Sequence, residues 1–156
     1  MNLYVNKINE EAAKEILSWQ YDKPYDFYNN ELTAEVLSEM LTEPYFSVFN
    51  EENILVGFFC IGGSAQVPND SVTYSLGYLD IGVGMRPDLT GQGRGTLFFE
   101  FVLSSIDKMF GQRPKRLTVA KFNDRAIHLY EKLGFKPEAA FLKGTTEFLI
   151  MIQPSS

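Results

Sequence analysis

The chain contains one cysteine, one histidine and one tryptophan among its 156 residues. A single cysteine cannot form an intrachain disulfide, and Cys60 lies in an apolar run, so we expect a reducing compartment. The lone cysteine and the lone histidine, His128, are poorly suited to a nucleophilic dyad. No metal site is predicted from this composition.

Long apolar runs and basic segments are also missing. The longest apolar run, 54–61, is too short to span a bilayer, and no basic segment followed by an apolar stretch opens the chain. The net charge of −6 argues against general nucleic-acid binding, which uses Lys and Arg to neutralise phosphates, and it favours a cationic substrate. We therefore expect a cytoplasmic protein with neither a nucleic-acid nor a membrane partner.

No internal repeat, low-complexity stretch or linker divides the sequence. Hydrophobic residues make up 45% of the chain, which is ample for a core. We expect residues 1–156 to form one domain, as a monomer or a homodimer.

Apolar periodicity and capping residues predict the order of the elements. Helices are expected at about 10–19, 34–43, 93–110 and 124–133, and strands at about 3–8, 45–49, 54–62, 76–85, 116–120, 135–142 and 146–152. Hairpins give antiparallel pairs, whereas the strand–helix–strand unit at 76–120 requires a parallel crossover. The sequence therefore predicts an α/β protein of the α+β type, with a central mixed sheet and about four helices.

Residues 80–97 are predicted to form a strand that passes through a glycine-rich turn into a helix. Gly91, Gly93 and Gly95 allow positive φ angles and a close approach of the backbone to a ligand. The amides of the turn, the free amides of the first helical turn and the helix dipole together favour a phosphate. The apolar stripe predicted for the helix is Leu97, Phe98, Phe101, Val102, Ile106, Met109 and Phe110.

Two common phosphate-binding motifs are disfavoured. A P-loop requires a lysine followed by Ser or Thr, whereas here Thr96 follows Gly95 without a lysine. The dinucleotide fingerprint has a different glycine spacing and an acidic residue at the end of the next strand, where this chain has Lys121.

Two segments together resemble the signature regions of the GNAT superfamily of acyl-CoA N-acyltransferases. The first is Thr-Gly-Gln-Gly-Arg-Gly at 90–95, which follows the family pattern Gln/Arg-x-x-Gly-x-Gly/Ala except at Thr90. The two regions occur in the family's order, about 25 to 35 residues apart. The second region, at 119–135, matches at Asn123, Ala126, Tyr130, Gly134 and Phe135.

The resemblance implies a GNAT-like fold, in which two parallel strands of the central sheet splay apart beyond a bulge. Gly82 and Gly84 lie where this chain would need that bulge or a close backbone approach. It also implies acetyl-CoA as the co-substrate, with the pyrophosphate held by amides of the turn and backbone N–H groups of Val83 and Met85 directed to the thioester and pantetheine. The implied cofactor-binding residues are Val83, Met85, Thr90, Gly91, Gln92, Gly93, Arg94, Gly95, Thr96 and Asn123. Asn123 fits equally well as a helix N-cap.

The implied reaction is direct transfer of an acyl group, most often acetyl, to a primary amine. Tyr130 is the candidate general acid, since a phenol with a pKa of about 10 keeps its proton at neutral pH. Spacing alone would favour a core tyrosine at this position. Asp80 is the candidate general base, with an ordinary surface aspartate as the alternative. His128, two residues before Tyr130 on a helix, is expected to face solvent.

The connector at 20–30 has more aromatic residues than an ordinary solvated loop. Aromatic faces and carboxylates suit an ammonium group, although the same aromatics would equally well close the open end of the core. Candidate substrate-binding residues are Trp19, Tyr21, Tyr25, Phe27 and Tyr28, with Asp22, Asp26 and Glu31 as acidic anchors and Phe141 and Phe148 as a facing wall.

Two functions other than catalysis remain open. One is a module that senses acyl-CoA without turnover, and the other is a protein-interaction domain that uses the aromatic segment 19–28 as its contact surface. For an enzyme, the acceptor would be a small-molecule amine, such as a polyamine or an antibiotic, or the amine of a peptide or protein.

Overall fold

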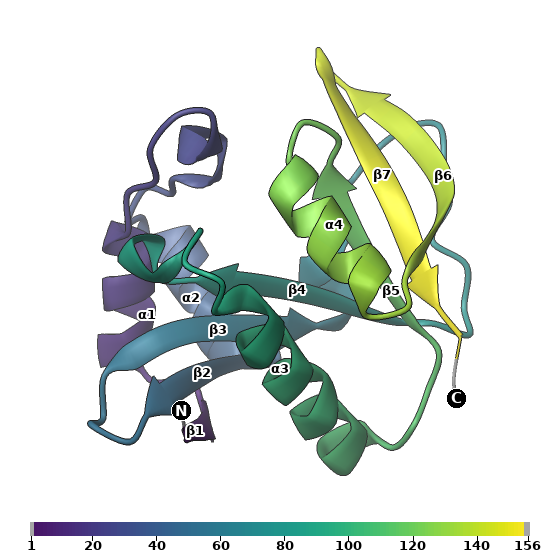
Figure 1. The fold of residues 1–156 in the computed structure, drawn as a ribbon. Helices are drawn as coiled ribbons and strands as arrows, with labels where there is room; N and C mark the ends of the chain where they lie inside the picture. Colours follow the sequence, from purple (N-terminus) through teal and green to yellow (C-terminus); the bar gives the residue numbers. More distant parts are fainter. Residues whose placement is uncertain (1, 155–156) are drawn as a thin grey trace. The chain divides into compact units, whose positions relative to one another are not determined.

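The computed structural model describes residues 2–154 (Figure 1). The order of strands and helices predicted from the sequence is confirmed. Three short 3-10 helices, η1 (Tyr25–Tyr28), η2 (Gly62–Ala65) and η3 (Pro87–Leu89), accompany them. The main elements are β1 (Leu3–Lys7), α1 (Glu10–Ser18), α2 (Ala34–Thr42), β2 (Tyr45–Asn50), β3 (Leu55–Ile61), β4 (Leu79–Met85), α3 (Gly95–Phe110), β5 (Lys115–Ala120), α4 (Asp124–Lys132), β6 (Lys136–Lys143) and β7 (Thr146–Gln153).

The chain divides into two compact units. The first unit contains the residues through Cys60 together with Val83–Gly95, and the second contains Ile61–Gly82 and the residues from Thr96 onward. Strand β4 therefore contributes its first residues to the second unit and its last residues to the first. Along the sheet, the strand order is β1-β2-β3-β4-β5-β7-β6.

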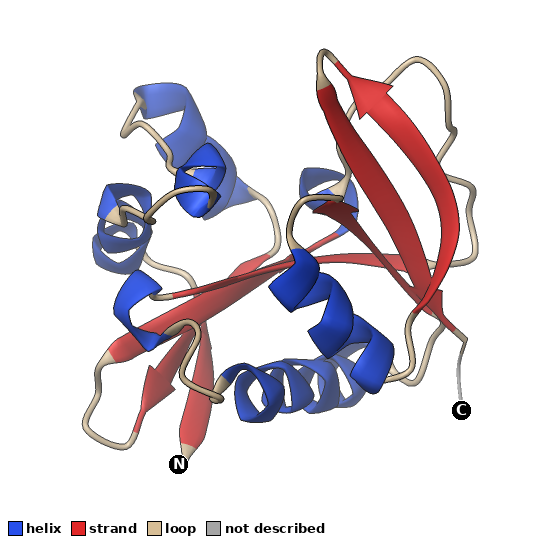
Figure 2. Ribbon diagram, turned by 45° about the horizontal axis from the view of Figure 1, so that its top comes forward, coloured by secondary structure: helices blue, strands red, loops and turns tan. Residues whose placement is uncertain are grey.

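The first unit is built on antiparallel pairs, β1 with β2 and β2 with β3, whose strands are red in Figure 2. Asn9 caps α1 by accepting a hydrogen bond from the Ala12 amide at 2.8 Å, and Thr33 caps α2 by accepting one from the Val36 amide at 3.2 Å. Both caps lie where the sequence predicts them. The core of this unit contains Ile8, Ala12, Ala13, Ile16, Leu17, Trp19, Met40 and Leu55.

The second unit combines parallel and antiparallel pairing, which confirms the predicted mixed sheet. The parallel ladder pairs Leu79 with Lys115 and Asp80 with Arg116, while β5 pairs with β7 along its whole length, to Ala120. Strands β6 and β7 form a hairpin that turns at Gly144, whose φ is 63°. Helices α3 and α4 lie side by side in Figures 1 and 2.

Two predicted element boundaries differ from the structure by more than one residue. Strand β4 begins at Leu79 rather than at residue 76, because Leu76 is 98% exposed and Gly77 has a φ of 105°, which lies outside the strand region. Helix α3 begins at Gly95 rather than at Gly93, because Gly93 has a φ of 75°. In both places a glycine with positive φ ends one conformation before the next begins.

The buried face of α3 also differs from the predicted stripe. Phe98, Val102 and Ile106 are buried as expected, whereas Leu97 and Met109 are exposed. A helix has room for only one buried stripe, and here that stripe includes a small polar side chain that apolar periodicity overlooks. The buried residues of α3 are Phe98, Phe99, Val102, Ser105 and Ile106.

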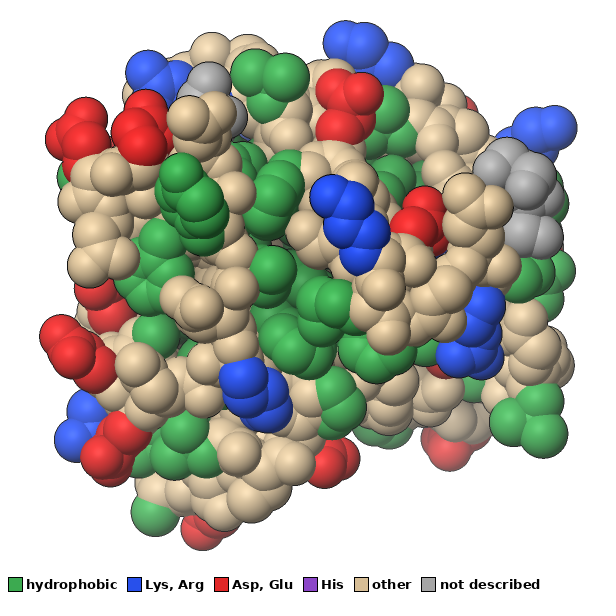
Figure 3. All heavy atoms as spheres, turned by 90° about the horizontal axis from the view of Figure 1, so that it is seen from below, with side chains coloured by type: hydrophobic (Ala, Val, Ile, Leu, Met, Phe, Trp, Pro, Cys, Tyr) green, Lys and Arg blue, Asp and Glu red, His purple; other side chains and the backbone are tan. Residues whose placement is uncertain are grey.

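Large hydrophobic side chains that remain exposed are distributed over strands, helices and loops. Figure 3 shows one face of the molecule, on which hydrophobic side chains adjoin Lys, Arg, Asp and Glu. Within residues 2–154, none of the helices combines the length and apolar character that crossing a bilayer requires. The exposed set is Tyr4, Phe27, Leu32, Leu41, Ile54, Leu76, Leu97, Met109, Phe122 and Leu142.

Gly84 of β4 lies against the ring of Phe58 on β3, within the first unit. A Cβ at position 84 would lie 2.2 Å from Cε1 of Phe58, which is closer than real carbon atoms approach. The Phe58 ring is itself held between Trp19 and Tyr45, each with its ring centroid 6.3 Å away. The predicted close backbone approach is therefore confirmed at Gly84.

We predict that Gly84→Ala destabilises the protein by about 1–3 kcal/mol, because the added methyl group must displace a packed ring. Chemical denaturation measures the loss. Gly63→Ala is the matched control, since a Cβ there would meet nothing within 4 Å. The explanation fails if both variants are equally stable, or if Phe58→Ala does not reduce the cost of Gly84→Ala.

Candidate functional site

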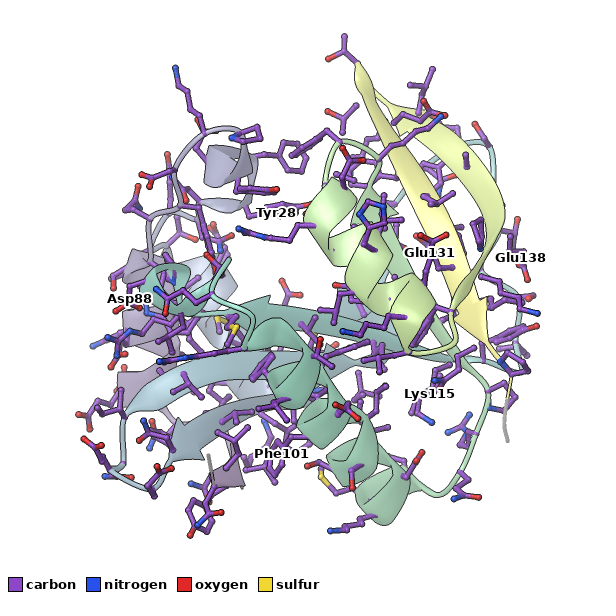
Figure 4. The ribbon with its side chains drawn as sticks, viewed as in Figure 1. Tyr28, Asp88, Phe101, Lys115, Glu131 and Glu138 are labelled. Carbon is purple, nitrogen blue, oxygen red and sulfur yellow. The ribbon has the colours of Figure 1, made fainter. Side chains whose placement is uncertain are left out.

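The turn that follows β4 is held by hydrogen bonds among its own residues. Arg86 pairs with Asp88 through two bonds, Nε to Oδ1 and Nη2 to Oδ2, each 2.7 Å long. The Thr90 hydroxyl donates to the Pro87 carbonyl at 2.7 Å, and the Gln92 side-chain amide donates to the Asp88 carbonyl at 2.7 Å. Thr90 and Gln92 therefore shape the turn with their side chains. Asp88 is labelled in Figure 4.

The Arg86–Asp88 pair also affects the ionisation of both groups. The hydrogen bond from Arg86 lowers the pKa of Asp88, and the same bond raises the pKa of Arg86. A carboxyl group with a lowered pKa stabilises the fold above its unfolded pKa, and this contribution is lost as the pH falls through the folded value. Because the pair is exposed to water, we expect only a small effect on stability.

The glycines of the turn adopt the conformation expected of an anion-binding loop. Gly91 and Gly93 have φ angles of 72° and 75°, and a Cβ at Gly93 would meet no atom within 4 Å. The backbone at Gly93 therefore borders open space. Arg94 is exposed, and the 16-residue helix α3 starts at Gly95. Backbone amides, a helix N-terminus and a guanidinium group fit the pyrophosphate that the resemblance implies.

The end of β4 has one edge bonded to β3 and one edge directed away from it. The Arg86 amide donates to the Val56 carbonyl of β3 at 2.8 Å. Backbone groups alternate in direction along a strand, so those of Gly84 also face β3, whereas those of Val83 and Met85 point the other way. We call this second side the free edge of β4. It is the side on which a ligand could accept hydrogen bonds from Val83 and Met85.

The first two residues of the aromatic segment 19–28, Trp19 and Tyr21, have structural partners in the first unit. Trp19 is buried in the core, and its ring lies beside Phe58. The Tyr21 hydroxyl donates to the Met85 carbonyl at 2.7 Å, and burial raises the pKa of Tyr21 to about 12. Trp19 therefore packs in the core, which is the alternative to substrate binding that the sequence left open for these aromatic residues.

The remaining connector aromatics lie on η1, nearer the surface. Phe27 is 47% exposed, and its ring packs edge-on against Tyr28 with centroids 5.2 Å apart. Tyr25 and Tyr28 are half-buried, and Tyr28 is labelled in Figure 4. The acidic candidates Asp22, Asp26 and Glu31 are all exposed. Binding of a substrate to this part of the connector stays a prediction.

In the second unit, Asp80 is not the exposed surface aspartate that the sequence suggested as an alternative to a general base. Its side chain is buried, with the residue only 5% exposed, and it pairs with Arg116, which is 2% exposed. Arg116 donates from Nε to Oδ1 at 2.6 Å and from Nη2 to Oδ2 at 2.9 Å. Gln66 adds a third hydrogen bond, to Oδ2 at 2.9 Å. A carboxylate that accepts three hydrogen bonds is poorly placed to accept a substrate proton.

Arg116 is the residue that sequence reasoning missed. Its guanidinium carbon lies 5.1 Å from the ring centroid of Tyr74 and 5.2 Å from that of Tyr78, and Nη2 donates to the Ser75 carbonyl at 2.9 Å. The hydrogen bond with Asp80 raises the pKa of Arg116, so the guanidinium stays charged although it is buried. The available signal was an arginine within a strand between two helices, where burial is expected.

The candidate acid Tyr130 lies on α4, with its ring in the core of the second unit. The ring centroid is 5.0 Å from that of Phe99 and 6.1 Å from that of Phe135. Asn123 is confirmed as the N-cap of α4, accepting from the Ala126 amide at 3.2 Å. His128 on the same helix is exposed, as predicted. The ring of Tyr130 thus has a packing role, and the catalytic role of its hydroxyl stays a prediction.

The candidate facing wall, Phe141 and Phe148, is a buried cross-strand pair of the β6–β7 hairpin. The two residues are directly opposite in register, and their rings stack with centroids 5.4 Å apart. Across the described residues 2–154, no group of three or more His, Cys, Asp or Glu side chains is arranged to hold a metal ion.

The predicted site residues are divided between the two units. Asp80, Thr96, Asn123 and Tyr130 belong to the second unit. The first unit contains the other predicted cofactor-binding residues and all five aromatic candidates, that is Trp19, Tyr21, Tyr25, Phe27, Tyr28, Val83, Met85 and 90–95.

The parallel β4–β5 pair in a mixed sheet and the glycine turn that leads from β4 into α3 are features of the GNAT-like fold that the resemblance implies. The sequence profile described as "Acetyltransferase (GNAT) family" matches residues 10–135. The chain therefore belongs to the GNAT acetyltransferase family, as the two signature regions indicated. A comparison with curated protein sequences found no match.

Solved structures share the fold at low sequence identity. The GNAT-family acetyltransferase from Bacillus anthracis is 17% identical, with a TM-score of 0.73, and the match covers 99% of this chain and 95% of that one. A chimera of the spermidine N-acetyltransferase SpeG from Vibrio cholerae with hSSAT is 18% identical, with a TM-score of 0.69 and coverages of 99% and 96%. A mutant form of the spermidine/spermine N-acetyltransferase SpeG from Vibrio cholerae is 19% identical, with a TM-score of 0.67 and coverages of 98% and 95%.

We predict that Arg116→Met destabilises the protein by about 3–5 kcal/mol, because it leaves the Asp80 carboxylate buried without its partner. Arg86→Met, which breaks an exposed pair, should cost only about 0–1 kcal/mol. Asp80→Asn combined with Arg116→Met should recover part of the loss. Equal effects of the two arginine substitutions on the free energy of unfolding would contradict the assigned burial.

Tyr21 should be visible in an alkaline titration. Its pKa is raised in the folded state, so its stabilising contribution is complete below pH 10 and is lost as the pH rises toward 12. Subtracting the tyrosinate absorbance curve of Tyr21→Phe from that of the wild type isolates this phenol. We expect a midpoint of about 12, and a difference curve centred on the ordinary value of 10.0 would contradict the burial of Tyr21.

Proposed function

We propose that this protein transfers an acetyl group from acetyl-CoA to a primary amine of a small cationic molecule, by direct attack of the amine. The observation that carries the proposal is the turn at Gly91 and Gly93, where positive φ angles leave the backbone open to a ligand just before α3. Its amides, with Arg94, hold the pyrophosphate. Acetyl-CoA supplies an activated thioester.

Each step of the proposed acyl transfer uses an identified group of this chain. The N–H groups of Val83 and Met85, on the free edge of β4, hydrogen-bond the pantetheine and the thioester oxygen, and so stabilise the negative charge that develops there. The amine nitrogen bonds to the carbonyl carbon as the carbon–sulfur bond breaks, and the Tyr130 hydroxyl gives its proton to the sulfur. The amine releases a proton to solvent, from which Tyr130 recovers its own.

Asp80 is not retained as the general base. Its carboxylate is committed to Arg116 and Gln66, so we assign it a structural role at the start of the parallel strand pair. Binding both reactants together accounts for much of the acceleration, since oriented pairs reach effective molarities of about 10⁵ M or more.

The proposed acceptor is a small molecule with more than one amine. The chain has a net charge of −6, and the exposed carboxylates Asp22, Asp26 and Glu31 flank in sequence the aromatic residues of η1, of which Phe27 is exposed. Such a surface favours an ammonium group over an anion. Spermidine, after which the Vibrio cholerae SpeG acetyltransferase is described, is the first acceptor to test.

A thiol-release assay with acetyl-CoA and a panel of amines tests the proposal. The wild type should transfer to at least one amine, with spermidine favoured over a peptide N-terminus. Tyr130→Phe should lower kcat by about 10²- to 10⁴-fold, the range for loss of a proton donor. His128→Ala, an exposed change on the same helix, should leave turnover unchanged.

Calorimetry separates binding from turnover. Gly93→Val should abolish acetyl-CoA binding, because a β-branched residue is strained at this φ and fills the open space. Gly144→Val is the matched control: its φ is also positive and its Cβ position is also open, but it lies in the β6–β7 turn. If the wild type binds acetyl-CoA but transfers to no amine, a module that senses acyl-CoA without turnover is favoured. If it does not bind acetyl-CoA, a protein-interaction domain is favoured. Either result refutes the proposal.

A further inference from the structure

The Tyr21 hydroxyl lies at the free edge of β4. It donates to the Met85 carbonyl at 2.7 Å, and the Tyr21 amide donates to Asn29 Oδ1 at 2.7 Å. The Asn29 side chain also donates to Gln20 Oε1 at 3.1 Å. Hydrogen bonds within the connector therefore hold the backbone around Tyr21. The Tyr21 hydroxyl bonds to β4 on the edge that carries the Val83 and Met85 N–H groups.

The peptide between Met85 and Arg86 is bonded on both sides. Its N–H group donates to the Val56 carbonyl of β3, and its carbonyl accepts from Tyr21. One residue earlier, Gly84 lies against the Phe58 ring. The Met85 N–H group lies on the preceding peptide, between Gly84 and Met85, which joins this one at the Met85 Cα. With one peptide bonded on both sides and Gly84 packed against a ring, the Met85 N–H group has little freedom to change direction before a ligand binds.

A hydroxyl is necessary for this arrangement, because an aromatic ring alone would fill the space but leave the carbonyl unbonded. Without a partner on the free edge, the Met85 carbonyl would have to turn toward water. Its peptide would rotate with it and change the Met85 dihedral angles, which set the direction of the Met85 N–H group on the preceding peptide. Burial raises the pKa of Tyr21 to about 12, so the phenol stays protonated, and therefore a donor, well above the physiological range. Neighbouring strands usually supply such a bond, whereas here a side chain does.

We infer that Tyr21 is a positioning residue for acyl transfer: by bonding the Met85 carbonyl, it restricts the Met85 dihedral angles and so holds the Met85 N–H group, on the preceding peptide, in the direction that receives the thioester. This inference rests on the proposed function. Tyr21 acts through Met85 and touches neither the amine nor the sulfur. Its loss should therefore affect the chemical step more than the binding of coenzyme A, which depends on the turn at 91–95.

Kinetics of Tyr21→Phe test the inference, with Tyr4→Phe as the control, since Tyr4 is an exposed tyrosine of the same unit. We expect kcat to fall about tenfold or more, because the hydrogen bond that orients the Met85 peptide is lost. KM for acetyl-CoA should stay within about twofold. Tyr4→Phe should match the wild type. If Tyr21→Phe keeps the wild-type kcat, the inference is wrong while the proposed function stands.

A second measurement does not depend on turnover. In a nitrogen–proton correlation spectrum, coenzyme A should shift the amides of Val83, Met85 and Gly93 in the wild type, and those of Gly84 and Arg86, which face β3, much less. Tyr21→Phe should lose the Met85 response and keep the Gly93 response. An unchanged Met85 response would overturn the inference. A wild type that neither binds coenzyme A nor acetylates any amine would refute the proposed function and the inference with it.

Discussion

The hydrogen bond from the Arg86 amide to the Val56 carbonyl decides which backbone groups of β4 are available to a ligand. Because direction alternates along a strand, this one bond assigns Gly84 to the β3 side and Val83 and Met85 to the other. Gly84 can occupy its place only without a side chain, since Phe58 fills the space beside it. The edge of β4 that we propose binds the thioester is therefore determined by how the opposite edge is packed.

Polar groups near β4 are used in two different ways. At its start, Asp80 is buried with Arg116, a charged pair that costs desolvation and is satisfied by further bonds from Gln66 and to Ser75. After its end, Arg86 and Asp88 form a pair in water that contributes little energy but helps to shape the turn. The buried pair stabilises the scaffold, and the exposed pair shapes the turn that we propose binds the ligand.

The element order, the mixed sheet, the helix caps at Asn9, Thr33 and Asn123, and the family could all be predicted from the sequence, because each depends on local residue patterns. The partners of Asp80 and Tyr21 could not. Asp80 is separated from Arg116 by 36 positions and Tyr21 from Met85 by 64, and neither pairing leaves a local signature. Ser105 was missed for a similar reason, since a buried polar residue does not contribute to an apolar stripe.

The buried charges also select the alignment of the two parallel strands. The ladder between β4 and β5 pairs Leu79 with Lys115 and Asp80 with Arg116, and so few backbone bonds discriminate weakly among alternative alignments. Sliding β4 forward by one residue would set Asp80 opposite Leu117. The Asp80 carboxylate would then be buried among apolar side chains without its charged partner. The Asp80–Arg116 ion pair thus helps to set the register of β4 against β5, which hydrophobic patterning sets in most sheets.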